Sequence, residues 1–357
     1  METVSTIPKD FNGQNIYVGM DVHDKSWKIH VFSDEFELKS WSQQPDVERL
    51  SNYLQKHYQG ANYLLAYESG FSGFWIQRAF QARGIDCRVV HAADVPTNSK
   101  EQIRKSDAID SKKIAKGLKN GDLNFIYVPD VQLELDRQLV RSRSTLSTES
   151  TRVKNRIKAL LKLHGMPIPP YGTKHWSRKF IAWLKRQEFA GLSGNLTMKN
   201  LIEELQFYDI QKKQVDTSIK SLSQKDYFNT NVKLLQGVPS IGLLTAMILL
   251  TEIGDISRFK RFDELCSFCG LAPNCHDSGE IKQSTGLSRR GNERVKTALI
   301  ECAWIAVRKD PALLLYYKEQ IVKMKAQKAI IKVTRKLLSR IRYVLIHQKQ
   351  YELGVIK

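Results

Sequence analysis

The sequence predicts an α/β domain at the start of the chain, a helical middle region and a mainly helical C-terminal domain. Strands and helices alternate over the first 130 residues, heptad-spaced apolar residues follow, and a glycine-punctuated region begins after Asn231. The chain has 357 residues, more than one hydrophobic core usually organises. We therefore place the domains at 1–130, 131–230 and 231–357.

The first domain opens with alternating and β-branched residues between Asn15 and Ser33, which predict two strands around a polar turn. A third strand at 36–41 completes a meander. The run ANYLLAYESG predicts a buried strand that ends at Glu68. The other expected elements are a helix at 47–57, a helix at about 73–83, a strand at 87–91 and a helix at about 106–118.

The middle region carries two heptad-like series, which favour a coiled-coil hairpin, although an ordinary core stripe explains them equally well. Between Arg137 and His164 there are eight Lys or Arg and one acid, Glu149, so this helix presents a basic face suited to phosphates. The heptad positions are Leu139, Leu146, Val153 and Leu160 in the first series and Leu201, Tyr208, Val215 and Leu222 in the second.

The C-terminal domain begins with QGVPSIGLLTAMILLTE at 236–252, which resembles a helix-hairpin-helix DNA-binding element. Ser240 stands where that pattern usually has its first glycine, and a purely structural turn between helices is the alternative. A basic helix from Tyr316 to Gln350 closes the chain, with ten Lys or Arg and one acid.

Charge and composition limit the function classes. Lys plus Arg number 56 against 37 Asp plus Glu, a formal net charge of +19 with a pI near 9.6, so a polyanionic partner is expected. No window approaches the roughly 18 apolar residues of a membrane span, and the start lacks a secretion signal pattern. We expect a cytoplasmic protein with no membrane partner, whose five cysteines are free thiols.

Four carboxylates form a candidate metal cage. Asp21 lies inside an apolar strand, where an unpaired acid is costly, and Glu68 ends a later strand. Asp107 and Asp110 lie three residues apart on one face of a helix start, where capping is the alternative explanation. Oxygen ligands from separate elements suit two Mg²⁺ ions, roughly 4 Å apart, in phosphoryl transfer on DNA. The ordered set resembles the RuvC-like branch of the RNase H fold.

A second candidate group lies near the end of the chain. Ser278 precedes a glycine and is followed by Lys282, Arg289 and Arg290, so its hydroxyl is a candidate nucleophile for a phosphodiester. Ser284 and Ser288 are alternatives. A zinc site built from Cys266, Cys269, Cys275 and His276 competes, but the adjacent Cys–His pair does not fit the usual two-plus-two spacing.

Several motifs together resemble the DEDD insertion-sequence transposases that move with a bridge RNA, insertion-sequence family one-ten with its eleven-eleven group. The resemblance covers nearly the whole chain. It rests on GMDVHDKSW, AYESG, KSDAIDSKKIAKGLKNGDL followed by VPD, RQLVRSRSTL…RVKNRIKALLKLHG and GVPSIGLLTA…GLAP…SG…G…RRGN.

The resemblance implies a RuvC-like domain that binds Mg²⁺ (or Mn²⁺) through Asp21, Glu68, Asp107 and Asp110, and a transposase domain whose nucleophile is Ser278. It also implies a covalent phosphoserine link to DNA, a homo-oligomer arranged as a dimer of dimers, and an element-encoded guide RNA that pairs with target and donor DNA. Asp277, directly before the serine, departs from the small residue usual in the family.

Two other functions fit the same residues. A RuvC-like endonuclease would use metal-activated water and need no serine, and a covalent protein–DNA adduct separates the two mechanisms. A non-enzymatic nucleic-acid-binding scaffold would use the acids only as helix caps, so replacing Asp21 would change nothing.

Overall fold

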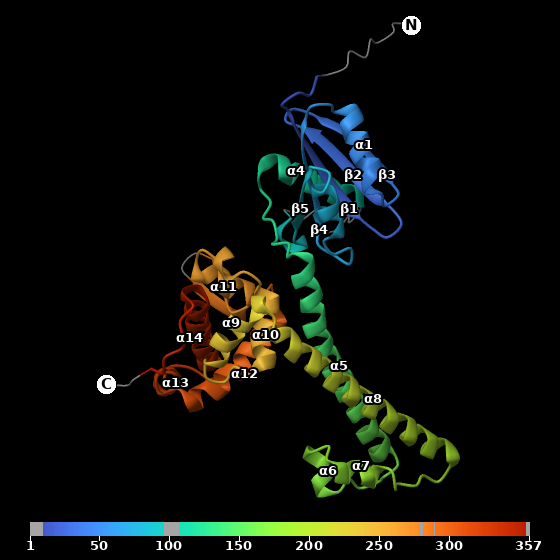
Figure 1. Cartoon of the computed structure of the whole chain (residues 1–357), viewed down its shortest axis with the longest axis vertical. Coiled ribbons are helices and arrows are strands. Elements are labelled where there is room, and N and C mark those ends of the chain that lie inside the picture. Colours follow the sequence, from blue (N-terminus) through green and yellow to red (C-terminus); the bar gives the residue numbers. More distant parts are fainter. Residues whose placement is uncertain (1–9, 96–106, 279–280, 289, 355–357) are drawn as a thin grey trace. The chain divides into compact units, whose positions relative to one another are not determined.

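The computed structural model describes residues 10–95, 107–278, 281–288 and 290–354, and it leaves out the side chains of 107, 108, 173, 174, 274–278 and 281–285. The chain forms two compact units, Met1–Val128 and Pro129–Lys357, and each is described by itself. Figure 1 labels most of their helices and strands.

The first unit is built on a five-stranded sheet with the order β3-β2-β1-β4-β5. Strands β1, β2 and β3 form an antiparallel meander, whereas β4 and β5 run parallel to β1. The strands are β1 (Asn15–Val22), β2 (Trp27–Ser33), β3 (Glu37–Gln43), β4 (Asn62–Glu68) and β5 (Asp86–Val90). The expected strands are therefore confirmed, including the one that ends at Glu68.

Helices cover both faces of this sheet. On one face α1 (Val47–His57) and α2 (Trp75–Gln81) bury Leu50, Ile76 and Phe80 against inward residues of the strands. On the other face α4 (Asp107–Asn120) packs against β1, β2 and β4, and a short turn of 3-10 helix spans Ala92–Asp94. The sequence predicted all three α-helices, and the bounds of α1 agree at both ends, since Asp46 caps its first turn.

The second unit is almost entirely helical. One large core cluster draws buried residues from α5 and from each α-helix from α8 to α14. In the part of the chain that is described, no helix is long and apolar enough to cross a membrane. The helices are α5 (Val131–Leu163), α6 (Pro170–Lys174), α7 (Arg178–Leu184), α8 (Leu192–Ser223), α9 (Asp226–Gln236), α10 (Leu243–Ile253), α11 (Phe262–Phe268), α12 (Glu293–Lys309), α13 (Pro311–Ile321) and α14 (Ala326–His347), with a 3-10 turn at Ile256–Arg258 and the hairpin strands β6 (Pro273–Ser278) and β7 (Ile281–Leu287).

Helices α5 and α8 pack side by side (Figure 1). Arg143 of α5 pairs with Asp216 of α8 at 2.9 Å, and Arg156 pairs with Glu204 at 2.7 Å, so the two helices run antiparallel, as the hairpin interpretation expected. The heptad positions were only partly right. On α5 only Val153 of the four is buried, because the buried stripe continues through Ile157 and Leu161.

The middle of this helical hairpin is polar. No residue of 141–149 on α5 or of 206–218 on α8 is buried. Apolar packing is confined to a base cluster, which includes Val140 and Leu222, and to a separate tip cluster, which includes Val153 and Phe180. The ion pair between Arg143 and Asp216 and partly buried side chains hold the helices together between the two clusters.

The C-terminal tail corrects one prediction. The single helix expected from Tyr316 to Gln350 is two helices, because α13 ends at Ile321 and α14 begins at Ala326. The core cluster contains both Leu313 and Leu345, which a straight helix would hold about 48 Å apart. The break lets both apolar faces join one core.

Candidate active site

Two of the predicted carboxylates lie at the same edge of the sheet. In the parallel register of β1 and β4, Met20 pairs with Tyr67, and these are the last paired residues before Asp21 and Glu68. Both acids therefore follow at the carboxyl ends of adjacent parallel strands. The side chain of Asp21 is 19% exposed, so this carboxylate lies at the edge of the core with access to solvent.

Helix α4 starts against the same edge. A Cβ atom on Gly19 would lie 2.1 Å from the Ser111 carbonyl oxygen and 2.4 Å from the Ala115 nitrogen, so only glycine permits this approach of helix to strand. Because side chains two residues apart share a face of a strand, Asp21 lies on the face covered by α4. Asp107 is the first residue of α4 and Asp110 lies in its first turn, beside Ser111.

The described side chains at this edge have basic neighbours. His23 Nε2 lies 3.3 Å from Asp21 Oδ2, and Lys113 Nζ lies 3.6 Å from Asp110 Oδ1. Among the described side chains, no group of three or more His, Cys, Asp or Glu is close enough to hold a metal, and the side chain of Asp107 lies outside them. His23 directly follows β1, in the polar turn that the sequence predicts there, and no sequence pattern marked it as a neighbour of Asp21.

The predicted nucleophile lies in the second unit, in the hairpin formed by β6 and β7. Ser278 is the last residue of β6 and pairs with Ile281 of β7, directly across the hairpin turn. Its side chain, like that of Ser284, lies outside the described residues. Ser284 pairs with Cys275 in the middle of the hairpin. Ser288 follows β7, and its hydroxyl accepts a hydrogen bond from the Arg290 backbone N–H at 3.1 Å.

The base of this serine hairpin is closed by two glycines. A Cβ atom on Gly291 would lie 2.0 Å from the Gly270 Cα atom, so the two backbones are in direct contact. Next to them the Asn292 N–H donates to the Phe268 carbonyl at 2.7 Å, and the Ser288 N–H donates to the Ala272 carbonyl at 3.0 Å. These contacts fix both ends of the segment that carries Ser278.

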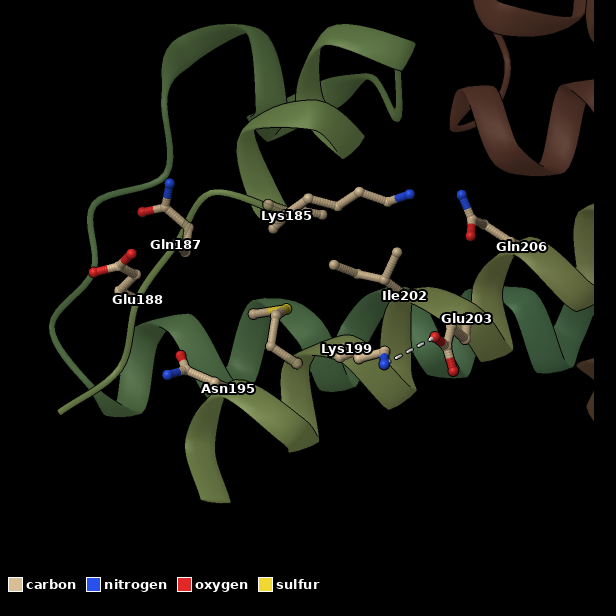
Figure 2. Close-up of a pocket in the computed structure, with 10 residues that line it drawn as sticks. Lys185, Gln187, Glu188, Asn195, Lys199, Ile202, Glu203 and Gln206 are labelled. Carbon is tan, nitrogen blue, oxygen red and sulfur yellow. Dashed lines mark ion pairs between the residues drawn. The ribbon is translucent and has the colours of Figure 1, made fainter. Parts of the chain in front are cut away.

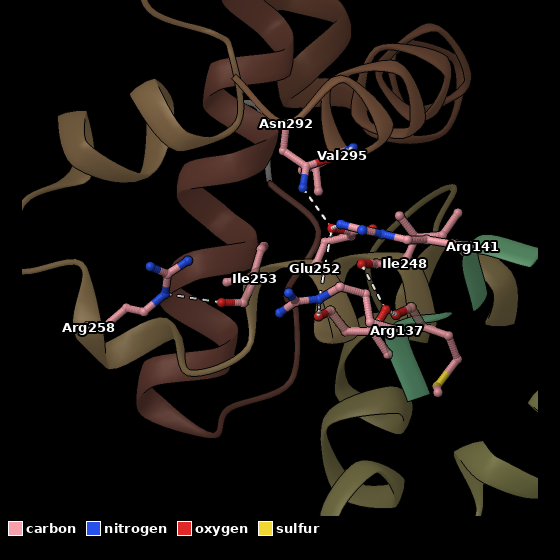
Figure 3. Close-up of polar contacts among 10 residues, drawn as sticks. Arg137, Arg141, Ile248, Glu252, Ile253, Arg258, Asn292 and Val295 are labelled. Carbon is pink, nitrogen blue, oxygen red and sulfur yellow. Dashed lines mark hydrogen bonds and ion pairs between the residues drawn. The ribbon is translucent and has the colours of Figure 1, made fainter. Parts of the chain in front are cut away.

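Asn292 connects the hairpin base to a buried acid, Glu252, at the end of α10 (Figure 3). The Asn292 side chain caps α12 by accepting from the Val295 N–H, and its Nδ2 donates to Glu252 Oε2 at 2.8 Å. Arg141 of α5 donates to both oxygens of this carboxylate, at 2.6 and 2.7 Å. The Glu252 side chain is only 2% exposed, so Arg141 supplies the charge that a buried carboxylate requires.

The electrostatics of Glu252 follow from these contacts. Burial by itself would raise the pKa of Glu252, but the hydrogen bonds from Arg141 and Asn292 outweigh it and hold the pKa below its usual value. Arg137 lies nearby, with its Nε donating to the Thr251 carbonyl at 2.7 Å. No local sequence pattern pointed to this cluster, because Arg141 and Glu252 are 111 positions apart.

Ser240 lies in the turn between α9 and α10, with a φ of 77° in the left-handed region that glycine favours. Its hydroxyl donates to the Cys302 carbonyl of α12 at 2.8 Å, and the Cys302 thiol donates back to the Ser240 carbonyl at 3.3 Å. Serine at the usual glycine position therefore ties this turn to α12.

The zinc interpretation receives no support from the described residues. Cys266 and Cys269 are free and buried in the core. Burial raises the pKa of both thiols, which opposes the thiolate form that zinc requires. The side chains of Cys275 and His276 are not described.

The arginines on α5 were expected to present a phosphate-binding face, but several have partners within the unit. Arg141, Arg143 and Arg156 each pair with an acid on α10 or α8. A pocket of about 500 Å³ at the hairpin tip is also mixed in charge, since Lys199 lies 4.0 Å from Glu203 and Glu188 lines the same pocket (Figure 2). Neither feature is a strong site for polyanions.

Both units match families of known proteins. Residues 18–166 match a family of DEDD transposases, described as "Transposase", and residues 232–318 match the family described as "Transposase IS116/IS110/IS902 family". The first match contains all four candidate acids, and the second contains Ser278.

Individual relatives agree with these matches. A Sinorhizobium fredii protein named as transposase y4qE is 28% identical over 239 residues, 67% of this chain and 57% of that protein, so the match spans little more than half of its length. The transposase for insertion sequence element IS1111A of Coxiella burnetii is 26% identical, over 80% of this chain and 78% of its own. The pilin gene-inverting protein of Moraxella bovis is 36% identical, over 34% of this chain and 38% of its own.

Proposed function

The chain belongs to the IS116/IS110/IS902 family of transposases, and on that basis we propose that it is an RNA-guided DNA recombinase that uses Ser278 as its nucleophile. The observation that carries the proposal is that the candidate metal-binding acids and the candidate nucleophile lie in two different regions, each of which matches a transposase family. Asp21 and Glu68 follow adjacent parallel strands in the first matched region, and Ser278 ends a strand of an anchored hairpin in the second.

The fold of the first unit supports a RuvC-like assignment within the RNase H fold. Its sheet combines a three-stranded antiparallel meander with two strands that run parallel to β1. Asp21 of β1 and Glu68 of β4 directly follow Met20 and Tyr67, which pair with each other near the carboxyl ends of these two strands. The turn at Ser240 supports a helix-hairpin-helix role for α9 and α10, in which backbone N–H groups approach a DNA phosphate.

The donor set fits a divalent metal, Mg²⁺ or Mn²⁺, because Asp21, Glu68, Asp107 and Asp110 offer only hard carboxylate oxygens. The family's DEDD domain implies such a metal in general. A bound metal would neutralise the charge that develops on the scissile phosphate. His23 and Lys113, which contact Asp21 and Asp110, hold those carboxylates in place.

The proposed reaction proceeds in two balanced transfers. The Ser278 oxygen forms a bond to the scissile phosphorus and loses its proton, while the bond from phosphorus to a deoxyribose oxygen breaks and that oxygen takes up a proton. In the second transfer a hydroxyl of another DNA strand displaces the serine, which regains its proton. The phosphodiester energy is conserved, so strands are rejoined without hydrolysis.

Partners follow from the same proposal. The substrates are target and donor DNA, sequence choice comes from pairing with an element-encoded guide RNA, and the acids of one subunit serve the serine of another in a homo-oligomer, a dimer of dimers. A protein that acts on DNA in this way would work in the cytoplasm.

The test is a denaturant-resistant protein–DNA adduct, formed with the element's noncoding RNA, Mg²⁺ and labelled DNA. We expect an adduct with the wild type, none with Ser278→Ala, and a weak one with Asp21→Asn. The variants Ser284→Ala and Ser288→Ala are matched controls that keep it. Cleavage without an adduct, unaffected by Ser278→Ala, would replace this mechanism with a RuvC-like endonuclease that uses water.

A further inference from the structure

Helix α14 lies outside both regions that match transposase families, since the second match ends at residue 318. The helix carries six Lys or Arg and no acid. Its apolar side, which includes Val333, Leu337 and Ile341, is buried in the large core. The basic residues therefore lie on the opposite, outward side.

The charges on this outward side differ in how they are compensated. Arg340 donates to the buried carboxylate of Asp310 at 2.8 Å, and Arg335 contacts Asp263 at 3.2 Å. Lys332 Nζ instead contacts a neutral amide, Gln320 Oε1, at 3.0 Å. Lys336 Nζ lies 4.6 Å from the centre of the Tyr316 ring. In the described part of the chain, neither lysine pairs with an acid.

These two lysines line a groove of about 510 Å³ between α11, α13 and α14. Both are exposed, and the rest of its lining includes Arg335, Arg340 and the rings of Phe262 and Tyr316. A second groove of about 610 Å³ shares Ser339 and Arg340 with the first and extends to Lys349, with Glu352 as its one acidic lining residue. Positive charge is thus concentrated at the Lys332–Lys336 end.

We propose that this α14 groove, defined by Lys332, Arg335, Lys336 and Arg340, docks the phosphate backbone of duplex DNA. The inference rests on the proposed function, because it takes DNA to be the substrate, but it concerns a surface separate from the serine hairpin. Lys332 and Lys336 are one helical turn apart, about 6 Å along the axis, and present two cations to one strand.

The groove suits a backbone better than unpaired bases. Its two aromatic rings, Phe262 and Tyr316, are both partly buried, and Lys336 Nζ lies over the Tyr316 ring, so little ring surface is open for base stacking. Flexible ammonium groups bind phosphates without reading sequence. Arg340 acts as support, since its charge is matched by Asp310.

The experiment measures binding of the full chain to a duplex DNA of unrelated sequence, without RNA or metal, by fluorescence anisotropy over a series of salt concentrations. The double variant Lys332→Gln/Lys336→Gln should bind roughly tenfold or more weakly at 0.1 M salt, and its slope of log K against log salt should be shallower by about 1.8. The matched control Lys199→Gln/Lys220→Gln removes two exposed charges from α8 and should bind like the wild type.

Variants that keep the positive charge show whether weaker DNA binding comes from the lost charge or from a disturbed fold. The variant Lys332→Arg/Lys336→Arg should restore affinity, whereas equal losses in the α14 and α8 double variants would overturn the proposal. Tighter, lysine-dependent binding of a matched RNA duplex would overturn the assignment to DNA. This binding is measured without RNA or metal and requires no covalent adduct, so a failure of the serine mechanism would leave the result of this experiment distinct.

Discussion

Replacing Arg141 by alanine would leave the carboxylate of Glu252 buried without its bidentate partner. The Glu252 side chain is 2% exposed, and Arg137 Nε lies 4.0 Å from it, too far for a strong hydrogen bond. Removal of one partner from a buried ion pair costs about 3–5 kcal/mol. With a urea m-value of about 2–3 kcal/mol/M, the unfolding midpoint of the second unit should fall by about 1–2.5 M.

Two further variants make this prediction specific. Glu252→Gln leaves Arg141, whose side chain is 38% exposed, with access to water, so it should cost less, about 1.5–3 kcal/mol. Arg152→Ala on the same helix removes an exposed pair with Glu149 and should cost about 0–1 kcal/mol. The double variant Arg141→Ala/Glu252→Gln should cost less than the sum of the two single changes.

Urea unfolding followed by circular dichroism provides the measurement. A loss for Arg141→Ala that lies within about 1 kcal/mol of the loss for Arg152→Ala would refute the reasoning. A larger loss of stability for Glu252→Gln than for Arg141→Ala would also refute it, because Glu252→Gln leaves unpaired a charge that water can reach, whereas Arg141→Ala leaves a buried one.

Four other outcomes are expected. Gly19→Ala places a methyl group 2.1 Å from the backbone of α4 and should lower the melting temperature of the first unit by several degrees in calorimetry, while Gly70→Ala, with open space around it, should not. Ser240→Ala should lower the free energy of unfolding in urea by about 1 kcal/mol, because the hydrogen bond to the Cys302 carbonyl is lost. Ser240→Gly should be close to neutral, because glycine adopts the positive φ without strain. A larger loss of stability for Ser240→Gly than for Ser240→Ala would contradict this expectation. Folding lowers the pKa of Glu252, so the stability that its charge contributes is present above about pH 4.3, the pKa of an unfolded glutamate, and is lost as the pH falls through the lower folded value. The stability advantage of wild type over Glu252→Gln should therefore shrink below about pH 4.3 and stay level between about pH 6 and 8. A series of unfolding curves at different pH values measures this difference. Chelation with EDTA should abolish adduct formation on gels yet leave duplex DNA binding unchanged in anisotropy, and loss of both would argue that the metal has a structural role.

Local patterns were sufficient for much of the secondary structure. The helix at 47–57 has an apolar stripe and a capping aspartate, and the strand before Glu68 is a short apolar run between polar residues, so both were predicted correctly. The meander of the first three strands was predicted, but the place of β4 beside β1 and the approach of α4 to Gly19 were not, because they depend on contacts between distant segments.

Predictions failed where tertiary contacts decided the structure. No glycine or proline marks the break between Ile321 and Ala326, which exists because both flanking helices reach one core. No hairpin was predicted around Ser278, because the strand sequences PNCHDS and IKQSTGL lack the apolar–polar alternation that marks a half-buried strand. The charge count on α5 did not reveal that Arg141 and Arg143 were already paired with distant acids.

The polar middle of the α5–α8 hairpin divides its unfolding into two steps. Because no residue of 141–149 or 206–218 is buried, loss of the tip cluster would expose none of the base cluster. Amide protons near Val153 and Phe180 should therefore exchange through sub-global opening of the tip, at a lower free energy than those near Leu222. The tip would behave as a separate foldon, which melts and reforms while the serine-bearing core stays native.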